Sequence, residues 1–289
     1  MHRIFLISCS KLVVTLSNLD LYMHQFFTRF LLAVIVLFFS LQTVARDYQN
    51  DKNRAFTAPL VMKDNVSLIS FTIEKIINKG SNRSIIFKLF NNKTEKPVTL
   101  DDLVLVHTQK MHALIIDDSL EDYSHVHPQT TNKPGNYLLS WTAKRDEGNY
   151  TLWLEIVPKA TNKKITFSSI LPFGEFESAV IDRTTVMTTE MNGFKFKLSF
   201  DIKPQAGKAI IGTVDIYPTP HLQPVMGAYA HIVAFSDDLK TLVHIHPMGR
   251  DPLRFHIQPE KPGFIKLFVQ VNINNQELFV PFSFMVGDN

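Results

Sequence analysis

An internal repeat constrains this 289-residue chain more than any other feature. Residues 111–128 and residues 230–247 each hold one histidine, a His-x-His pair thirteen residues further on, and then a proline. The first set is His112, His125 and His127, and the second set is His231, His244 and His246. The offset between the sets, 231 minus 112, is 119 residues, and twice that offset nearly fills residues 46–289. The chain is therefore predicted to be a tandem repeat of one domain.

Both copies have the apolar pattern of β-strands. In Phe194–Phe200 apolar and polar side chains alternate, which is the period of a half-buried strand, and Ser84–Phe90 is rich in β-branched and aromatic residues. About seven short strands per copy is typical of an immunoglobulin-like sandwich. The predicted fold is all-β, with two tandem Ig-like sandwiches of the cupredoxin or fibronectin type III kind, over residues 46–176 and 177–289. A single large jelly roll is the alternative, which the repeat disfavours.

Residues 1–45 are predicted to be a signal peptide. The apolar run Phe30–Leu41 has 12 residues, whereas spanning a bilayer takes about 20. It follows Arg29 and precedes Thr43-Val44-Ala45, which matches the basic, apolar and cleavage regions of a secretory signal. A start at Met23 would give a signal of ordinary length, and an uncleaved anchor is the alternative. The expected location is periplasmic or secreted, with membrane contact only during export.

Composition limits which ligands and partners are available. The single cysteine, Cys9, precedes the predicted cleavage point, so a metal site in the exported chain must use histidine, methionine or carboxylate ligands. The chain has 30 basic and 27 acidic residues, a net charge of +3. Without a marked basic excess there is no electrostatic case for nucleic-acid binding.

The histidine spacing predicts metal chelation. Residues i and i+2 of a strand face the same side, so the two members of each His-x-His pair project together. A hairpin would bring the first histidine of each set alongside. Its register matters, because a turn centred on residue 119 would place His112 opposite Val126 and on the wrong face. A half-step shift of register or a bulge is therefore required.

Five residues before the first histidine of each set lies a fourth candidate ligand, His107 in one copy and Met226 in the other. Imidazole suits copper, zinc and nickel, and a thioether favours Cu(I), so copper is predicted for the second copy. All-histidine ligation leaves zinc a near-equal alternative for the first copy. The competing interpretation is a structural cluster in which the rings hydrogen-bond backbone carbonyls. The predicted ligands are His107, His112, His125, His127, Met226, His231, His244 and His246.

Catalytic patterns are weak, and the protein is predicted not to be an enzyme. Ser124 beside His125 has no nucleophile elbow or third partner. The pairs Asp117-Asp118 and Asp237-Asp238 fall at predicted hairpin turns, where aspartate stabilises the turn itself. Cupin oxygenases also use His-x-His on a β scaffold, but a glutamate shortly after the pair is missing in both copies.

The blocks Met111-His112 to His125-Val126-His127-Pro128 and His231 to His244-Ile245-His246-Pro247 resemble those of a family of bacterial envelope proteins with tandem Ig-like domains. That family is associated with copper and heavy-metal handling. The resemblance implies a periplasmic protein that binds metal through these six histidines, for storage, buffering or delivery, with another envelope metal-handling protein as a partner. This chain departs in having no acidic residue beside His107. The alternative function is an envelope adhesion or assembly module with structural histidines.

Overall fold

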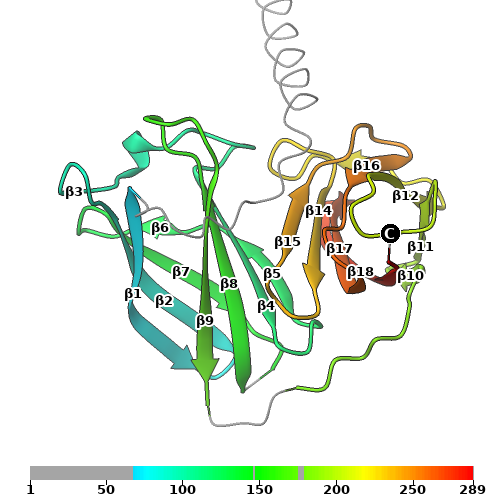
Figure 1. Ribbon diagram of the computed structural model, residues 1–289, viewed down its shortest axis with the longest axis horizontal. Helices are drawn as coiled ribbons and strands as arrows, with labels where there is room; N and C mark the ends of the chain where they lie inside the picture. Colours follow the sequence, from blue (N-terminus) through cyan, green and yellow to red (C-terminus); the bar gives the residue numbers. More distant parts are fainter. Residues whose placement is uncertain (1–67, 146, 175–178, 289) are drawn as a thin grey trace, which may run out of the picture. The chain divides into compact units, whose positions relative to one another are not determined.

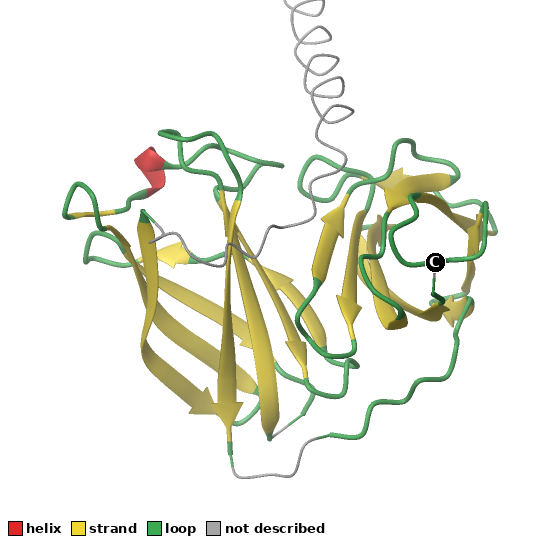
Figure 2. Ribbon diagram, viewed as in Figure 1, coloured by secondary structure: helices red, strands yellow, loops and turns green. Residues whose placement is uncertain are grey.

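The computed structural model describes residues 68–145, 147–174 and 179–288. Almost every element within these ranges is a strand, and one short 3₁₀ turn, η1 (Leu100–Asp102), is the sole helical element there (Figure 2). None of the described helical residues forms a segment long and apolar enough to cross a membrane. The predicted signal peptide, residues 1–45, and the proposed start at Met23 lie outside the described residues.

The first sandwich is made of two antiparallel sheets (Figure 1). One sheet has the order β1 (Ile69–Lys79), β2 (Asn82–Asn91), β7 (Asn136–Thr142) and β6 (Gln129–Thr130), with β3 (Lys96–Pro97) paired to β2. The other has the order β5 (Tyr123–Val126), β4 (Met111–Asp117), β8 (Gly148–Ile156) and β9 (Ile165–Phe173). Buried side chains of both sheets, among them Phe87, Leu139 and Leu152, form the core between them.

The second sandwich repeats this plan with β10 to β18. One sheet has the order β10 (Thr188–Met191), β11 (Phe194–Phe200), β12 (Ile210–Tyr217) and β16 (Leu253–Ile257). The other joins β13 (Leu222–Gln223), β17 (Gly263–Ile273), β14 (His231–Ser236) and β15 (Leu242–Ile245), and β18 (Gln276–Val286) pairs with β17. Its own core contains Phe196, Val269 and Phe282. The predicted all-β sandwich architecture is confirmed.

Strand β4, which carries His112, is buried on both faces, unlike the alternating strands predicted from sequence. All seven residues of β4 are buried, whereas β2 alternates between buried and partly exposed positions. Met111, Ala113 and Ile115 of β4 point into the sandwich core, and Leu114 and Ile116 belong to a different apolar cluster. A nearly continuous apolar run is typical of a strand that is covered on both faces. The outer face of β4 is therefore covered by another part of the chain.

That second apolar cluster, called here the shared cluster, contains side chains from both sandwiches. β4, β5 and β8 contribute Leu114, Ile116, Tyr123 and Trp153, and β14, β15 and β17 contribute Val233, Phe235, Leu242, Phe264 and Phe268. The outer face of one β-sheet therefore packs on the outer face of its counterpart. Each half alone would expose this apolar face to water.

Candidate metal centre

Two equivalent hairpins position the histidines. In the β4–β5 hairpin Leu114 pairs with His125 and Ala113 with Val126, which brings His112 into line with His127. In the β14–β15 hairpin Val233 pairs with His244, and the same register aligns His231 with His246. This is the half-step register that the sequence required for all three rings to share a face. The rings thus lie on the outer sheet faces that also carry the shared cluster.

Turn chemistry fixes this register. At the tip of the first hairpin the Asp117 carboxylate accepts hydrogen bonds from the backbone N–H groups of Glu121 and Asp122, both at 2.9 Å. Leu120, in the same turn, has a positive φ of 65°, and Leu239 in the second hairpin has one of 53°. Asp117 is fully buried, and its Oδ2 accepts a hydrogen bond from Arg145 Nη1 at 2.7 Å, so its role is structural, as predicted for the aspartate pairs.

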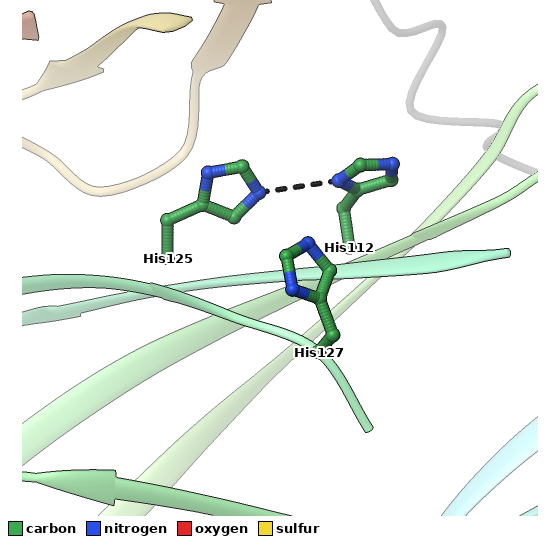
Figure 3. A group of neighbouring side chains, drawn as sticks. All are labelled: His112, His125 and His127. Carbon is green, nitrogen blue, oxygen red and sulfur yellow. Dashed lines mark hydrogen bonds between the residues drawn. The ribbon is translucent and has the colours of Figure 1, made fainter. Parts of the chain in front are cut away.

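The three histidines of the first set converge. Nδ1 of His112 lies 3.2 Å from Nε2 of His125, and one ring nitrogen from each of the three histidines lies within 4.8 Å of the others. Figure 3 shows the three rings gathered around one point. Nε2 of His127 is buried and has no hydrogen-bond partner among the described residues. A buried, unpartnered nitrogen beside two others is what a bound ion would satisfy.

The second set repeats the arrangement and meets the first. Nδ1 of His231 lies 3.3 Å from Nε2 of His244 and 2.9 Å from Nε2 of His246. Ring nitrogens of His125, His231 and His244 also lie within 4.8 Å of one another. The structure therefore brings the six histidines into one cluster between the sandwiches, whereas the sequence had suggested one site within each.

The fourth candidate ligands occupy equivalent tight turns. His107 and Met226 both have left-handed backbones, with φ of 46° and 49°. The ring of His107 lies against that of His246 in the other sandwich, with centroids 3.8 Å apart. The structure thus places His107 in the cluster, while Met226 is half-buried in the matching turn.

Outward-facing ring nitrogens meet hydrogen-bond acceptors, which fixes the tautomers of four histidines. Nε2 of His112 lies 3.0 Å from the Val106 carbonyl, and Nε2 of His231 lies 3.0 Å from the Val225 carbonyl. Carbonyl and carboxylate oxygens only accept, so each ring must donate its N–H there. The remaining two contacts cross between the sandwiches: His125 Nδ1 to Gln270 Oε1 at 2.8 Å, and His244 Nδ1 to Glu155 Oε2 at 2.9 Å.

The inward-facing nitrogens of His112, His125 and His231 consequently carry lone pairs when these rings are neutral. The amide of Gln270 cannot be reversed to change this, because its Nε2 donates to Glu277 Oε1 at 2.6 Å. Nδ1 of His112 therefore faces Nε2 of His125 at 3.2 Å with no proton to share. Only an added proton or a cation makes such a contact favourable.

Burial makes protonation unfavourable at neutral pH. Loss of hydration, and then repulsion from neighbouring histidines, lowers the pKa of His112 to about 3 and that of His231 to about 2. The same causes lower the pKa of His125 and His246 well below the usual range. The rings of His112, His125, His231 and His246 are thus neutral, which is the ligand form of histidine.

The nitrogen spacing suits a metal ion. An ion with Zn–N bonds of about 2.0–2.1 Å in tetrahedral geometry has ligand nitrogens about 3.3–3.4 Å apart, close to the 3.2 and 3.3 Å found here. Ligating histidines also commonly donate their other N–H to a carboxylate or a carbonyl. The residues present therefore fit a metal ion in both their lone pairs and their supporting contacts.

Comparison with known proteins assigns the chain to a family. A family described as "Domain of unknown function (DUF8832)" matches residues 64–170 and 189–288, more than half of the chain. The chain belongs to this family. No curated protein matches it. Since the family's description names no function, the resemblance to copper-handling envelope proteins stays a prediction.

The matching solved structures are distant from this chain. MtrC from Shewanella baltica OS185 matches at 7% identity and a TM-score of 0.25, with 75% of this chain and 68% of MtrC covered. The BSP domain of a biofilm-associated protein matches at 12% identity and a TM-score of 0.21, over 76% of this chain and 30% of that one. A protein described as "Putative membrane anchored protein from Corynebacterium diphtheriae" matches at 10% identity and a TM-score of 0.21. The match covers 78% of this chain and 60% of that one. Likeness at this level carries no conclusion about function.

Two supporting residues, Glu155 and Gln270, were not predicted. Neither lies near a histidine in the sequence, but Glu155 pairs with His112 across β4 and β8, and Gln270 pairs with His231 across β14 and β17. Aligning the repeated strands from Gly148 and Gly263 places a polar residue at the same position in each. That repetition was the available signal.

Proposed function

We propose that this protein binds metal ions through its clustered histidines, in the periplasm or outside the cell, and that it stores, buffers or delivers them without acting as an enzyme. The proposal rests on one observation: the buried, neutral rings of His112 and His125 face each other through lone pairs at 3.2 Å, beside the unpartnered Nε2 of His127. Each set supplies three ring nitrogens, and two ions, one per set, would satisfy them. Hydrogen bonding from outside keeps the lone pairs directed inward.

Copper is the first choice of metal and zinc the alternative. Imidazole ligands suit both, and copper has the highest affinity in the divalent first-row series. Met226 stands beside the second set in sequence and would favour Cu(I) there. Zinc fits the tetrahedral nitrogen spacing equally well. In either case the rings must stay neutral to bind, so acid releases the metal.

Pairwise replacement of the His-x-His histidines should remove the ions one at a time. The variant with His125→Ala and His127→Ala is expected to take up one ion fewer per chain than wild type, and adding His244→Ala with His246→Ala should remove the second. Calorimetric titration with Zn²⁺ at micromolar protein, together with elemental analysis, measures this. His221→Ala, at an exposed histidine, is the matched control and should bind like wild type.

A second candidate function is an envelope adhesion or assembly module. The contacts from His125 to Gln270 and from His244 to Glu155 join the sandwiches without metal, which favours a structural role for the rings. If that role is the whole explanation, wild type shows no saturable metal uptake. The histidine variants then lose only stability, about 1–3 kcal/mol for each unsatisfied partner.

A further inference from the structure

The two histidine sets are nearly equivalent but differ in one supporting residue. Behind His244 stands the carboxylate of Glu155, whereas behind His125 stands the neutral amide of Gln270. Both supporting residues come from the opposite sandwich. Both are also buried, at 5% and 1% exposure, so solvent does not screen the difference between them.

Glu155 is charged despite its burial. Nζ of Lys164 lies 2.8 Å from its Oε1, and Nδ1 of His244 donates to its Oε2 at 2.9 Å, and both contacts stabilise the ionised carboxylate. Its Oε2 therefore presents a carboxylate to the His244 ring. Gln270 Oε1 presents only a carbonyl dipole to His125. The carboxylate of Glu277 contacts the amide nitrogen of Gln270, so the Gln270 side chain lies between this carboxylate and the His125 ring.

A carboxylate behind a metal-bound imidazole raises the basicity of that ligand and favours a positive ion next to it. Lys164 offsets part of the negative charge of Glu155, but it contacts Oε1, whereas His244 contacts Oε2. By contrast, an amide orients the ring without adding charge. The two sets therefore have the same ligand types but different electrostatic support.

We infer that Glu155 makes the two metal positions unequal, so that the second set, His231, His244 and His246, binds a divalent ion more tightly than the first set and fills first. This inference rests on the proposed function. Glu155 acts as a positioning residue, since it touches a ligand and not the ion. The protein would then hold one retained ion and one exchangeable ion in a single centre, which suits buffering or delivery.

Four variants test this inference in the full chain with Zn²⁺ as the probe. His127→Ala disables the first set and leaves binding at the second, whereas His246→Ala disables the second and leaves binding at the first. Glu155→Gln is then added to each background. We expect it to weaken Zn²⁺ binding about 10- to 100-fold in the His127→Ala background, and less than about 3-fold in the His246→Ala background, by competition titration with a chelator.

A reciprocal variant, in which the carboxylate is moved to the first set, distinguishes an electrostatic effect of Glu155→Gln from a folding defect. In Gln270→Glu with Glu277→Gln the hydrogen bond between the two side chains is kept, and the carboxylate moves behind His125. This variant should tighten binding in the His246→Ala background. Equal effects of Glu155→Gln in both backgrounds, or no effect in either, would overturn the inference while leaving the proposed function standing. Absence of any Zn²⁺ uptake by wild type would overturn both.

Discussion

Acidifying the metal-free protein from pH 7 to pH 5 is expected to lower its free energy of unfolding by several kcal/mol. Burial lowers the pKa of His112 to about 3 and of His231 to about 2, whereas an unfolded histidine titrates near 6.5. Below pH 6.5 the unfolded chain therefore takes up protons that the folded chain does not. Each such histidine removes at most about 1.4 kcal/mol of stability per pH unit until its folded pKa is reached.

Urea unfolding at pH 7, 6 and 5 with a chelator present measures this slope above the range where carboxylates titrate. His231→Phe keeps a planar ring at the fully buried position and removes one titrating group. Its slope should be shallower than that of wild type by up to about 1.4 kcal/mol per pH unit. Equal stability at pH 7 and pH 5 would show that the rings are not held neutral by burial.

Replacing Phe235 with alanine should cost about 3–5 kcal/mol of stability. Phe235 is fully buried in the shared cluster, with its ring centroid 5.4 Å from that of Tyr123 and 5.3 Å from that of Trp153, both in the other sandwich. The truncation would leave a cavity among aromatic rings that belong to two separate sheets. The loss should therefore reach both sandwiches together, as a fall in the midpoint of thermal or urea unfolding.

The matched control for Phe235→Ala is Ile170→Ala on β9, a side chain 67% exposed. It should change stability by no more than about 0.5 kcal/mol. If the Phe235 variant is as stable as this control, the outer faces of the two sheets do not pack on each other, and the histidine sets would have no reason to meet.

The fold was largely predictable because several of its strands, unlike β4, alternate. The pattern in Phe194–Phe200 matches the burial of Phe196 and Leu198 in β11. The two tryptophans, Trp141 and Trp153, are buried at 5% and 4% exposure, but Trp153 lies in the shared cluster and not between the sheets of its own sandwich. The sequence shows apolar character but not which of two apolar faces a side chain joins.

The candidate site was predictable in its parts but not in its assembly. Spacing along the chain placed three histidines on each hairpin, because strand geometry is local. The meeting of His125 with His231 and His244 depends on docking of two hairpins that are 119 residues apart (231 minus 112), which no local period encodes. The supporting residues Glu155 and Gln270 act across the same interface, so they could be assigned only once the docking was known.

Crystals grown with Zn²⁺ and measured at the zinc absorption edge test the metal assignment most directly. We expect an anomalous peak between His112 Nδ1, His125 Nε2 and His127 Nε2, and a second beside His231 Nδ1 and His244 Nε2, each with Zn–N distances of about 2.0–2.1 Å. A protein with no anomalous peak at either histidine set, despite Zn²⁺ in solution, would contradict the account.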